Sequence, residues 1–221
     1  MKTLECRGIT LSDKQTKICV PITGTDLEEI KEQAEKIANM NLDIVEWRAD
    51  FYDVKDNDET EFEQCLKAIN DNLKSIPIIY TYRTSNEGGE KSIDVDDYCR
   101  LCKYVSEISE KYNVAMIDVE LYENKDRKDI GKLLLDIKST GVKVIGSNHH
   151  FEGTPSEKDI FNVLKTMEEA GADICKIAVM PKEKVEVKTL INASKKANKE
   201  LNAPIITMSM GELGAVTRIC T

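Results

Sequence analysis

Short apolar segments alternate with amphipathic segments along the chain, and this alternation constrains the fold more than any other feature. Seven segments are rich in Ile and Val: 16–23, 43–50, 76–84, 114–121, 143–150, 174–181 and 204–210. Such continuous apolar runs are typical of parallel strands that are buried on both faces. The sequence therefore predicts seven buried strands.

The segments between the strands show the spacing of amphipathic helices. In residues 25–40 the apolar side chains of Leu27, Ile30, Ala34 and Ile37 fall on one helical face. Five more segments have the same character: 58–74, 95–112, 127–140, 156–171 and 185–201. Strands that alternate with helices form parallel sheets with right-handed crossovers, so the chain is an α/β protein.

Two α/β architectures fit this pattern, a doubly wound sheet and a (β/α)8 TIM-type barrel. The strands recur about every 30 residues, a spacing that favours the barrel. The sequence contains neither a GxGxxG after the first strand nor a GxxxxGK[ST], the patterns of dinucleotide and P-loop sites. We expect one barrel domain over residues 1–221 that lacks the eighth strand at its C-terminal end. A hairpin over residues 3–14, turning at Arg7-Gly8, is predicted before the first barrel strand.

Charge and composition exclude several functions. The formal net charge is −9, which argues against nucleic-acid or anionic-membrane binding, and an anionic substrate then needs a local cluster of Arg or Lys. No apolar stretch approaches the ~18 residues that span a bilayer, and the start of the chain lacks a signal region, which predicts a cytoplasmic location. Seven scattered cysteines read as reduced thiols. The only histidines, His149 and His150, are adjacent, so sites with separated His ligands are excluded.

Charged residues recur near the C-terminal ends of the predicted strands, where an unpaired charge costs several kcal/mol if it is buried. They are Glu46, Arg48, Asp50, Arg83, Asp118, Glu120, His149 and Lys176. Any one of them fits a structural ion pair. Their recurrence in strand after strand favours a site at this end of the barrel, where barrel active sites lie.

Lys176 has the most apolar sequence context of any lysine, between Cys175 and Ile177. Desolvation favours the neutral amine, and a neutral amine forms a Schiff base with a ketone or aldehyde. The alternative is a structural ion pair with Asp118 or Glu120. The two interpretations are compatible, since a nearby carboxylate would manage protons during imine formation.

His149 is the only candidate for a general base near neutral pH, although both histidines also fit a surface loop. Glu87, followed by Gly88-Gly89, is placed to set the tautomer of the His149 ring. Arg48, Arg83 and Arg218 are candidates for binding an anion through bidentate hydrogen bonds. For each of them the alternative is a salt bridge with a neighbouring carboxylate.

Several stretches, in order along the chain, resemble the type I 3-dehydroquinate dehydratases of the shikimate pathway. They are KICVPITG (17–24), EWRADF (46–51), YRTSNEGGE (82–90), MIDVEL (116–121), SNHHFEGTP (147–155), ADICKIAVMP (172–181) and TMSMGELGAVTR (207–218). EWRAD, SNH-x-F and the K-x-A strand together make the match specific. The resemblance covers nearly the whole chain.

The resemblance implies a (β/α)8 barrel that dehydrates 3-dehydroquinate to 3-dehydroshikimate, a small-molecule substrate, without metal or organic cofactor. It implies that Lys176 is the Schiff-base lysine, His149 the general acid and base, and Glu87 the carboxylate that orients it. Glu46, Arg48 and Arg83 resemble residues that bind the substrate hydroxyls and nearby groups, and Arg218 resembles the arginine that binds the substrate carboxylate. The family usually forms homodimers.

The chain departs from the family in two places. His150 stands where the family often has Asp, and the family continues beyond the match to TRIC with an eighth strand and a SAPGQ-like loop that these residues do not include. Two alternatives therefore stay open. One is a catalytically impaired, truncated barrel, and the other is a different Schiff-base enzyme such as an aldolase.

Overall fold

A curled parallel sheet of seven strands forms the centre of the molecule. The structure is a computed structural model that describes residues 2–12, 15–54, 58–122 and 127–218. The strands follow one another in chain order, each parallel to the next: β3 (Cys19–Ile22), β4 (Ile44–Arg48), β5 (Ile78–Thr81), β6 (Val114–Glu120), β7 (Lys143–His150), β8 (Ile174–Val179) and β9 (Ile205–Ser209). Each lies within a predicted segment, so all seven strand predictions are confirmed.

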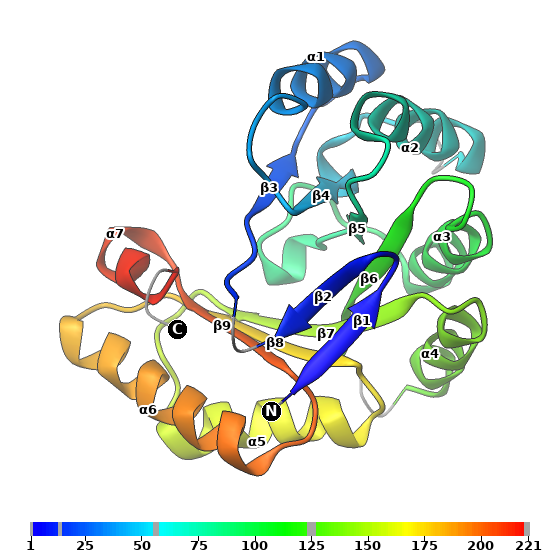
Figure 1. Cartoon of the computed structure of the whole chain (residues 1–221). Coiled ribbons are helices and arrows are strands. Elements are labelled where there is room, and N and C mark those ends of the chain that lie inside the picture. The colour runs from blue at the N-terminus through cyan, green and yellow to red at the C-terminus, as the bar shows by residue number, and fades with distance from the viewer. Residues whose placement is uncertain (1, 13–14, 55–57, 123–126, 219–221) are drawn as a thin grey trace.

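Helices cover the outer face of the curled sheet. Between consecutive strands lie α1 (Leu27–Ile37), α2 (Glu59–Leu73), α3 (Val95–Glu107), α4 (Lys128–Ser139), α5 (Glu157–Glu169) and α6 (Lys184–Glu200), and Figure 1 shows them around the outside of the arc of strands. Short elements follow β4, β5 and β9: η1 (Ala49–Phe51), η2 (Ser85–Glu87), and α7 (Gly211–Gly214) with η3 (Ala215–Arg218). This is the wall of a (β/α)8 barrel, as the sequence predicts, with β3 and β9 at its two ends.

Side chains that accept hydrogen bonds from backbone N–H groups mark where several helices begin. Asp26, Asp58, Asp94 and Ser156 cap α1, α2, α3 and α5, respectively. Such caps satisfy amides that have no partner inside the helix. Five of the six predicted helical segments are longer than the observed helices, and the sixth, 185–201, is shifted by one residue from α6.

The main hydrophobic core lies between the sheet and the helices. Alternate strand residues point outward into it, among them Val45 and Trp47 of β4 and Tyr80 of β5, all with no exposed surface. Trp47 packs against Phe62 of α2 and Tyr80, with ring centroids 5.6 Å apart in both pairs. The other residues of each strand point to the interior of the curled sheet.

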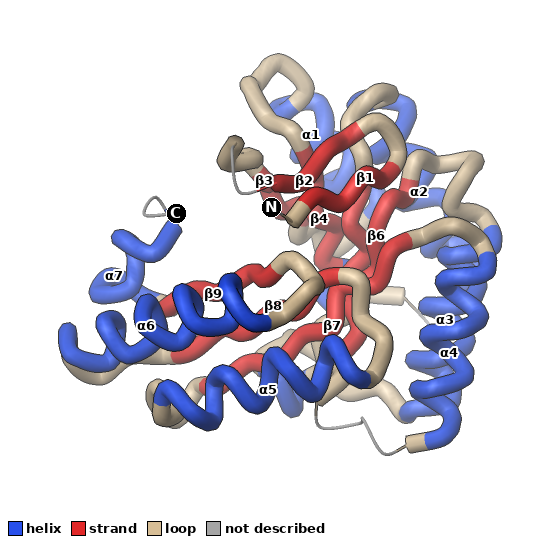
Figure 2. The backbone as a smooth tube through the Cα atoms, turned by 60° about the horizontal axis from the view of Figure 1, so that its bottom comes forward, coloured by secondary structure: helices blue, strands red, loops and turns tan. Residues whose placement is uncertain are grey.

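A two-stranded hairpin covers the end of the curled sheet where its strands begin. Strands β1 (Thr3–Cys6) and β2 (Ile9–Ser12) are antiparallel, and Arg7 and Gly8 form the turn with φ of 37° and 80°. Two positive φ angles in a two-residue loop match the twist of the flanking strands. Residues 13–14 of the predicted hairpin lie outside the described residues. In Figures 1 and 2 the hairpin lies across the curled sheet.

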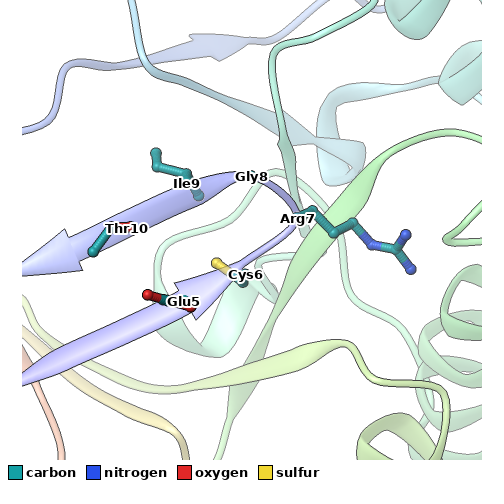
Figure 3. Close-up of a pocket in the computed structure, with 6 residues that line it drawn as sticks. All are labelled: Glu5, Cys6, Arg7, Gly8, Ile9 and Thr10. Carbon is teal, nitrogen blue, oxygen red and sulfur yellow. The ribbon is translucent and has the colours of Figure 1, made fainter.

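The hairpin and the N-terminal ends of the strands enclose a second, smaller core. Cys6 and Ile9 of the hairpin pack with interior-facing residues of β4 to β8: Ile44, Ile79, Ala115, Met116, Ile145 and Ile174. Arg7 fixes the turn by donating to the carbonyl of Val114 at 2.7 Å and to the Ser109 hydroxyl at 2.9 Å. A pocket of about 380 Å³ is lined by residues 5–10 of this hairpin (Figure 3). It lies at the opposite end of the strands from the charged residues.

Candidate active site

Charged and polar side chains fill the interior of the sheet at the C-terminal ends of β4 to β8. The strand register accounts for the clustering, because Arg48 is aligned with Thr81, Thr81 with Asp118, and Ser147 with Lys176. Aligned residues of parallel neighbours point to the same face, so polar side chains from neighbouring strands enter the same space. The predicted grouping of charges at this end of the sheet is confirmed.

Lys176 points into this polar interior. Its Nζ donates to Asp118 Oδ2 at 2.9 Å and lies 4.0 Å from Glu46 Oε1, and its side chain is 13% exposed. The apolar context expected from Cys175 and Ile177 is not the environment of the amine. Those two side chains are buried on the outer face of β8, because adjacent strand residues point in opposite directions.

Asp118 is the central acceptor of the cluster. Its Oδ1 accepts from Arg83 Nη2 at 2.7 Å and from the Ser147 hydroxyl at 2.5 Å, while Oδ2 accepts from Lys176. Burial opposes its ionisation, yet the positive charges of Arg83 and Lys176 outweigh burial and hold the pKa of Asp118 well below its usual range. The carboxyl is therefore ionised at neutral pH.

Arg83 lies in a buried ion-pair network. The residue is 3% exposed, and its Nη1 lies 2.9 Å from Ser147 Oγ, 3.2 Å from Glu120 Oε1 and 3.5 Å from Glu87 Oε2. Burial disfavours the charged guanidinium, but Asp118, Glu120 and Glu87 reverse that effect and raise the pKa of Arg83. The sequence analysis left open whether Arg83 forms a salt bridge with neighbouring carboxylates, and in the structure it does.

His149 and Glu87 form a hydrogen-bonded pair. The distance from His149 Nδ1 to Glu87 Oε2 is 2.9 Å, and Asn148 Nδ2 donates to Glu87 Oε1 at 3.2 Å. Burial, followed by the positive charges of Arg83 and Lys176, lowers the pKa of His149 to about 2. Burial and the nearby charge of Glu120 raise the pKa of Glu87 to about 8. Both groups are thus driven toward their neutral forms.

Two glycines allow the loop after β5 to carry Glu87 close to β7. Gly88 has φ 81°, and an added Cβ would lie 2.2 Å from the ring of Phe151, which directly follows β7. An added Cβ at Gly89 would lie 1.9 Å from the carbonyl oxygen of Arg83. An added side chain would meet backbone at Gly89 and the tip of the Phe151 ring at Gly88, so close packing holds the loop beside His149.

Arg48 and Glu46 lie on the β4 side of the cluster. Arg48 makes a bidentate pair with the buried Asp50, at 2.8 Å from Nε and 2.7 Å from Nη2. Glu46 accepts from the Thr81 hydroxyl at 2.8 Å. Both side chains keep some exposed surface, 23% in each case, and can meet a ligand in the interior.

Arg218 lies apart from this network. It is exposed on η3, and no hydrogen bond or ion pair joins it to another of the residues that the structure describes. The structure therefore brings together Lys176, His149, Glu87, Glu46, Arg48 and Arg83, but not Arg218.

Two residues of β7 take part in the site although they are not among the candidate residues named from the sequence. Ser147 joins Arg83 to Asp118, and Asn148 holds Glu87. Both are buried inside a strand. Polar residues that interrupt an apolar strand are the signal that identifies them, because a buried polar group requires a partner.

The arrangement supplies an amine, an ion-paired carboxylate and an imidazole on one face of adjacent strands. Lys176 of β8 is aligned with Ser147 of β7, two residues before His149. An amine and a neutral imidazole are the groups needed for imine formation and proton abstraction next to a carbonyl. In the described part of the chain, no three His, Cys, Asp or Glu side chains gather as they would around a metal ion.

Comparison with known proteins gives consistent matches. A family model described as type I 3-dehydroquinase matches residues 18–221. The 3-dehydroquinate dehydratase of Listeria monocytogenes serotype 4a is 37% identical over 99% of this chain and 84% of its own length. That of Klebsiella pneumoniae strain 342 is 39% identical over 96% of this chain and 83% of its own length.

Solved structures match in the same way. The type I 3-dehydroquinate dehydratase of Clostridium difficile, determined with covalently modified comenic acid, superposes with a TM-score of 0.92 at 36% identity. The match covers 99% of this chain and 85% of the other. The enzyme of Geobacillus kaustophilus also superposes with a TM-score of 0.92, at 31% identity over 99% of this chain and 83% of the other.

No helix in the described ranges is long and apolar enough to cross a membrane.

Proposed function

The chain belongs to the type I 3-dehydroquinase family, and from this premise we propose that Lys176, His149 and Glu87 carry out the family's reaction here. The activity is that of a 3-dehydroquinate dehydratase of type I, a hydro-lyase of the shikimate pathway whose family works through a Schiff base. The observation that carries the assignment of residues is the Lys176 amine in the polar interior, on the strand next to the His149–Glu87 pair.

The reaction begins at Lys176. The ammonium first gives up one proton, and the free amine then attacks the ketone of 3-dehydroquinate. The ketone oxygen takes up that proton and one from the nitrogen and leaves as water, and the resulting protonated imine is an electron sink for the neighbouring carbon. The C2 proton, weakly acidic beside a ketone, becomes removable once the nitrogen carries a positive charge. His149 then accepts that proton on Nε2, and the electron pair of the C2–H bond forms an enamine.

The same histidine serves the second half of the reaction. The enamine expels the C1 hydroxyl, and protonated His149 donates its proton to that leaving group as water. General acid–base catalysis of this kind typically contributes ~10²–10⁴-fold. Hydrolysis of the remaining imine releases 3-dehydroshikimate and restores the Lys176 amine.

The charged residues around the amine are proposed to bind the substrate. Glu46 and Arg48 line the interior beside Lys176 and retain exposed surface, which supports contacts with substrate hydroxyls. Arg83 is proposed to contact nearby substrate groups, and Arg218 to bind the substrate carboxylate. Since the donors of Arg83 meet protein acceptors, any contact it makes with substrate has to share or displace them.

Reductive trapping tests the proposal. Borohydride added with 3-dehydroquinate is expected to leave a covalent adduct on the 221-residue chain, and peptide mapping is expected to place it on Lys176. The variant Lys176→Met, an unbranched side chain one atom shorter and without the amine, serves as the control and should gain no mass. A folded wild-type chain whose mass stays unchanged would count decisively against this function.

A turnover assay separates the remaining alternatives. Formation of the conjugated enone product, followed by its ultraviolet absorbance, would exclude the catalytically impaired barrel. Turnover of sugar phosphates without turnover of 3-dehydroquinate would favour the aldolase alternative.

We further propose that the protein is a cytoplasmic homodimer. Six cysteines in the described residues are free thiols, as is usual in a reducing compartment, while Cys220 lies outside those residues. Sedimentation velocity tests the dimer, and cell fractionation tests the location.

A further inference from the structure

Asp118 is the best-connected group of the charged interior, and the reaction steps above give it no part. Its two oxygens have separate partners. Oδ1 accepts from Arg83 at 2.7 Å and from Ser147 at 2.5 Å, whereas Oδ2 accepts from Lys176 Nζ at 2.9 Å. The first two donors fix the carboxylate, and the second oxygen faces the nitrogen that reacts.

This carboxylate is suited to a fixed charge rather than to proton transfer. Asp118 is 1% exposed, and the guanidinium of Arg83 is buried against it. A carboxylate with a permanent cation on one side and a hydroxyl donor beside it holds a proton poorly. The proton exchange suggested from the sequence for a carboxylate near Lys176 is therefore better assigned to His149, whose imidazole is neutral.

Building on the proposed function, we propose that Asp118 is a further catalytic residue, the counter-ion that stabilises the positively charged imine formed on Lys176. Before reaction, Oδ2 accepts a hydrogen bond from the lysine nitrogen. When the amine condenses with the ketone and water leaves, one N–H remains on the imine nitrogen, and that N–H donates to the same oxygen.

The fixed acceptor also has a geometric consequence. A protonated imine is planar, so the direction of its N–H fixes the plane of the adjacent carbon atoms. With Oδ2 held in place by the contacts of Oδ1, the imine cannot rotate freely about the lysine side chain. Asp118 thus both stabilises the charge and restricts the orientation in which the C2 proton meets His149.

The test is borohydride trapping as a function of pH, at saturating 3-dehydroquinate, for the wild-type chain and for Asp118→Asn. The asparagine has the same shape but no charge, so the imine should lose its proton more easily. The yield of adduct should fall at high pH, where the imine loses its proton. We expect this alkaline limb to move to lower pH by about one unit or more, which is a tenfold change in the proton affinity of the imine. A role of Asp118 in folding alone would lower the amount of folded protein without moving this limb.

Glu120→Gln is the matched control. Glu120 lies on the same strand and pairs with Arg83 at 3.2 Å, but the distances that link Lys176 to carboxylates are to Asp118 and Glu46. This variant disturbs the buried ion pairs to a similar degree and should leave the alkaline limb in place. Equal shifts in Asp118→Asn and Glu120→Gln would overturn the proposal.

A second variant covers the case in which Asp118→Asn does not fold. Ser147→Ala keeps the carboxylate, and Arg83 still holds Oδ1, but one hydrogen bond that withdraws charge from Asp118 is lost. We expect the alkaline limb to move to higher pH, and an unchanged limb would overturn the proposal. If the wild-type chain forms an adduct but neither variant moves the limb, only the counter-ion fails. A wild-type chain that forms no adduct overturns the proposed function and the counter-ion together.

Discussion

At the scale of single residues, the proposed role of His149 as a base depends on its pairing with Glu87. The two side chains are 2.9 Å apart and titrate as a coupled pair. A protonated Glu87 donates to Nδ1, which leaves the ring hydrogen on Nε2 and blocks that nitrogen as an acceptor. Loss of one proton from the pair makes Nδ1 the donor and frees Nε2. The pair is therefore active as a base only after Glu87 has ionised.

This dependence predicts the pH profile of kcat/KM. Because burial raises the pKa of Glu87 to about 8, activity should fall as the pH drops through that region. In Glu87→Gln the amide oxygen accepts from Nδ1 at any pH, so the acid limb should move down by about one pH unit or more. The measurement is kcat/KM for 3-dehydroquinate between pH 5 and pH 9.

Glu90→Gln is the control for that experiment, because Glu90 is an exposed carboxylate of the same loop. Its acid limb should coincide with that of the wild type. An acid limb of Glu87→Gln that also coincides with the wild type would remove Glu87 from control of the base.

The sequence singled out the residues that are proposed to react, but it did not predict their environments. The alternation of strand residues explains the difference at Lys176, whose sequence neighbours Cys175 and Ile177 pack into the outer core. The amine instead meets Asp118 of β6, 58 residues earlier in the chain. A partner so distant follows only from strand order and register, and these are properties of the assembled sheet.

At the scale of elements, the loop after β5 depends on its contact with the segment after β7. Phe151 lies against the Cα of Gly88. Gly88 follows Glu87 by one residue in the sequence, and Phe151 follows His149 by two. The contact thus joins the two segments that carry Glu87 and His149. Sequence reasoning singled out the Gly88-Gly89 pair beside Glu87, but not the Phe151 ring that an added Cβ at Gly88 would meet.

Gly88→Ala should therefore be costly. The substitution adds strain at φ 81° and a clash with Phe151, and we expect a loss of about 1–3 kcal/mol in the free energy of unfolding together with reduced kcat. Urea denaturation and steady-state kinetics measure the two effects. The double variant Gly88→Ala/Phe151→Ala should recover the part of the lost stability that comes from the clash.

Gly131→Ala provides a matched comparison on α4. An added Cβ there meets nothing within 4 Å, so alanine should stabilise the helix by up to ~1 kcal/mol and leave kinetics unchanged. Equal effects of the two glycine substitutions would contradict the role given to the Gly88 contact.

At the scale of the whole molecule, the hairpin ties together strands that are far apart in the sequence. Ile9 is 7% exposed and packs in a cluster that includes side chains from β4, β5, β6, β7 and β8. Because residues 1–221 are predicted to form one domain, this cluster and the outer core should unfold together. The seven strands and six helices were predictable because period and length distinguish them. The packing of the hairpin against the sheet was not predictable from its own short sequence.

Ile9→Ala tests this arrangement. Removing a buried isoleucine should cost about 2–4 kcal/mol in the free energy of unfolding, seen as a lower urea midpoint in a single transition with unchanged slope. Leu135→Ala, at a position 72% exposed on α4, should change stability by less than about 0.5 kcal/mol. Two separate transitions in the wild type would show that the hairpin cluster unfolds on its own.

The hairpin turn and the Lys176 cluster occupy opposite ends of the same strands, with apolar residues such as Ile79 and Ile145 between them. Mutations in the hairpin are therefore expected to change the free energy of unfolding while the geometry around Lys176 stays the same.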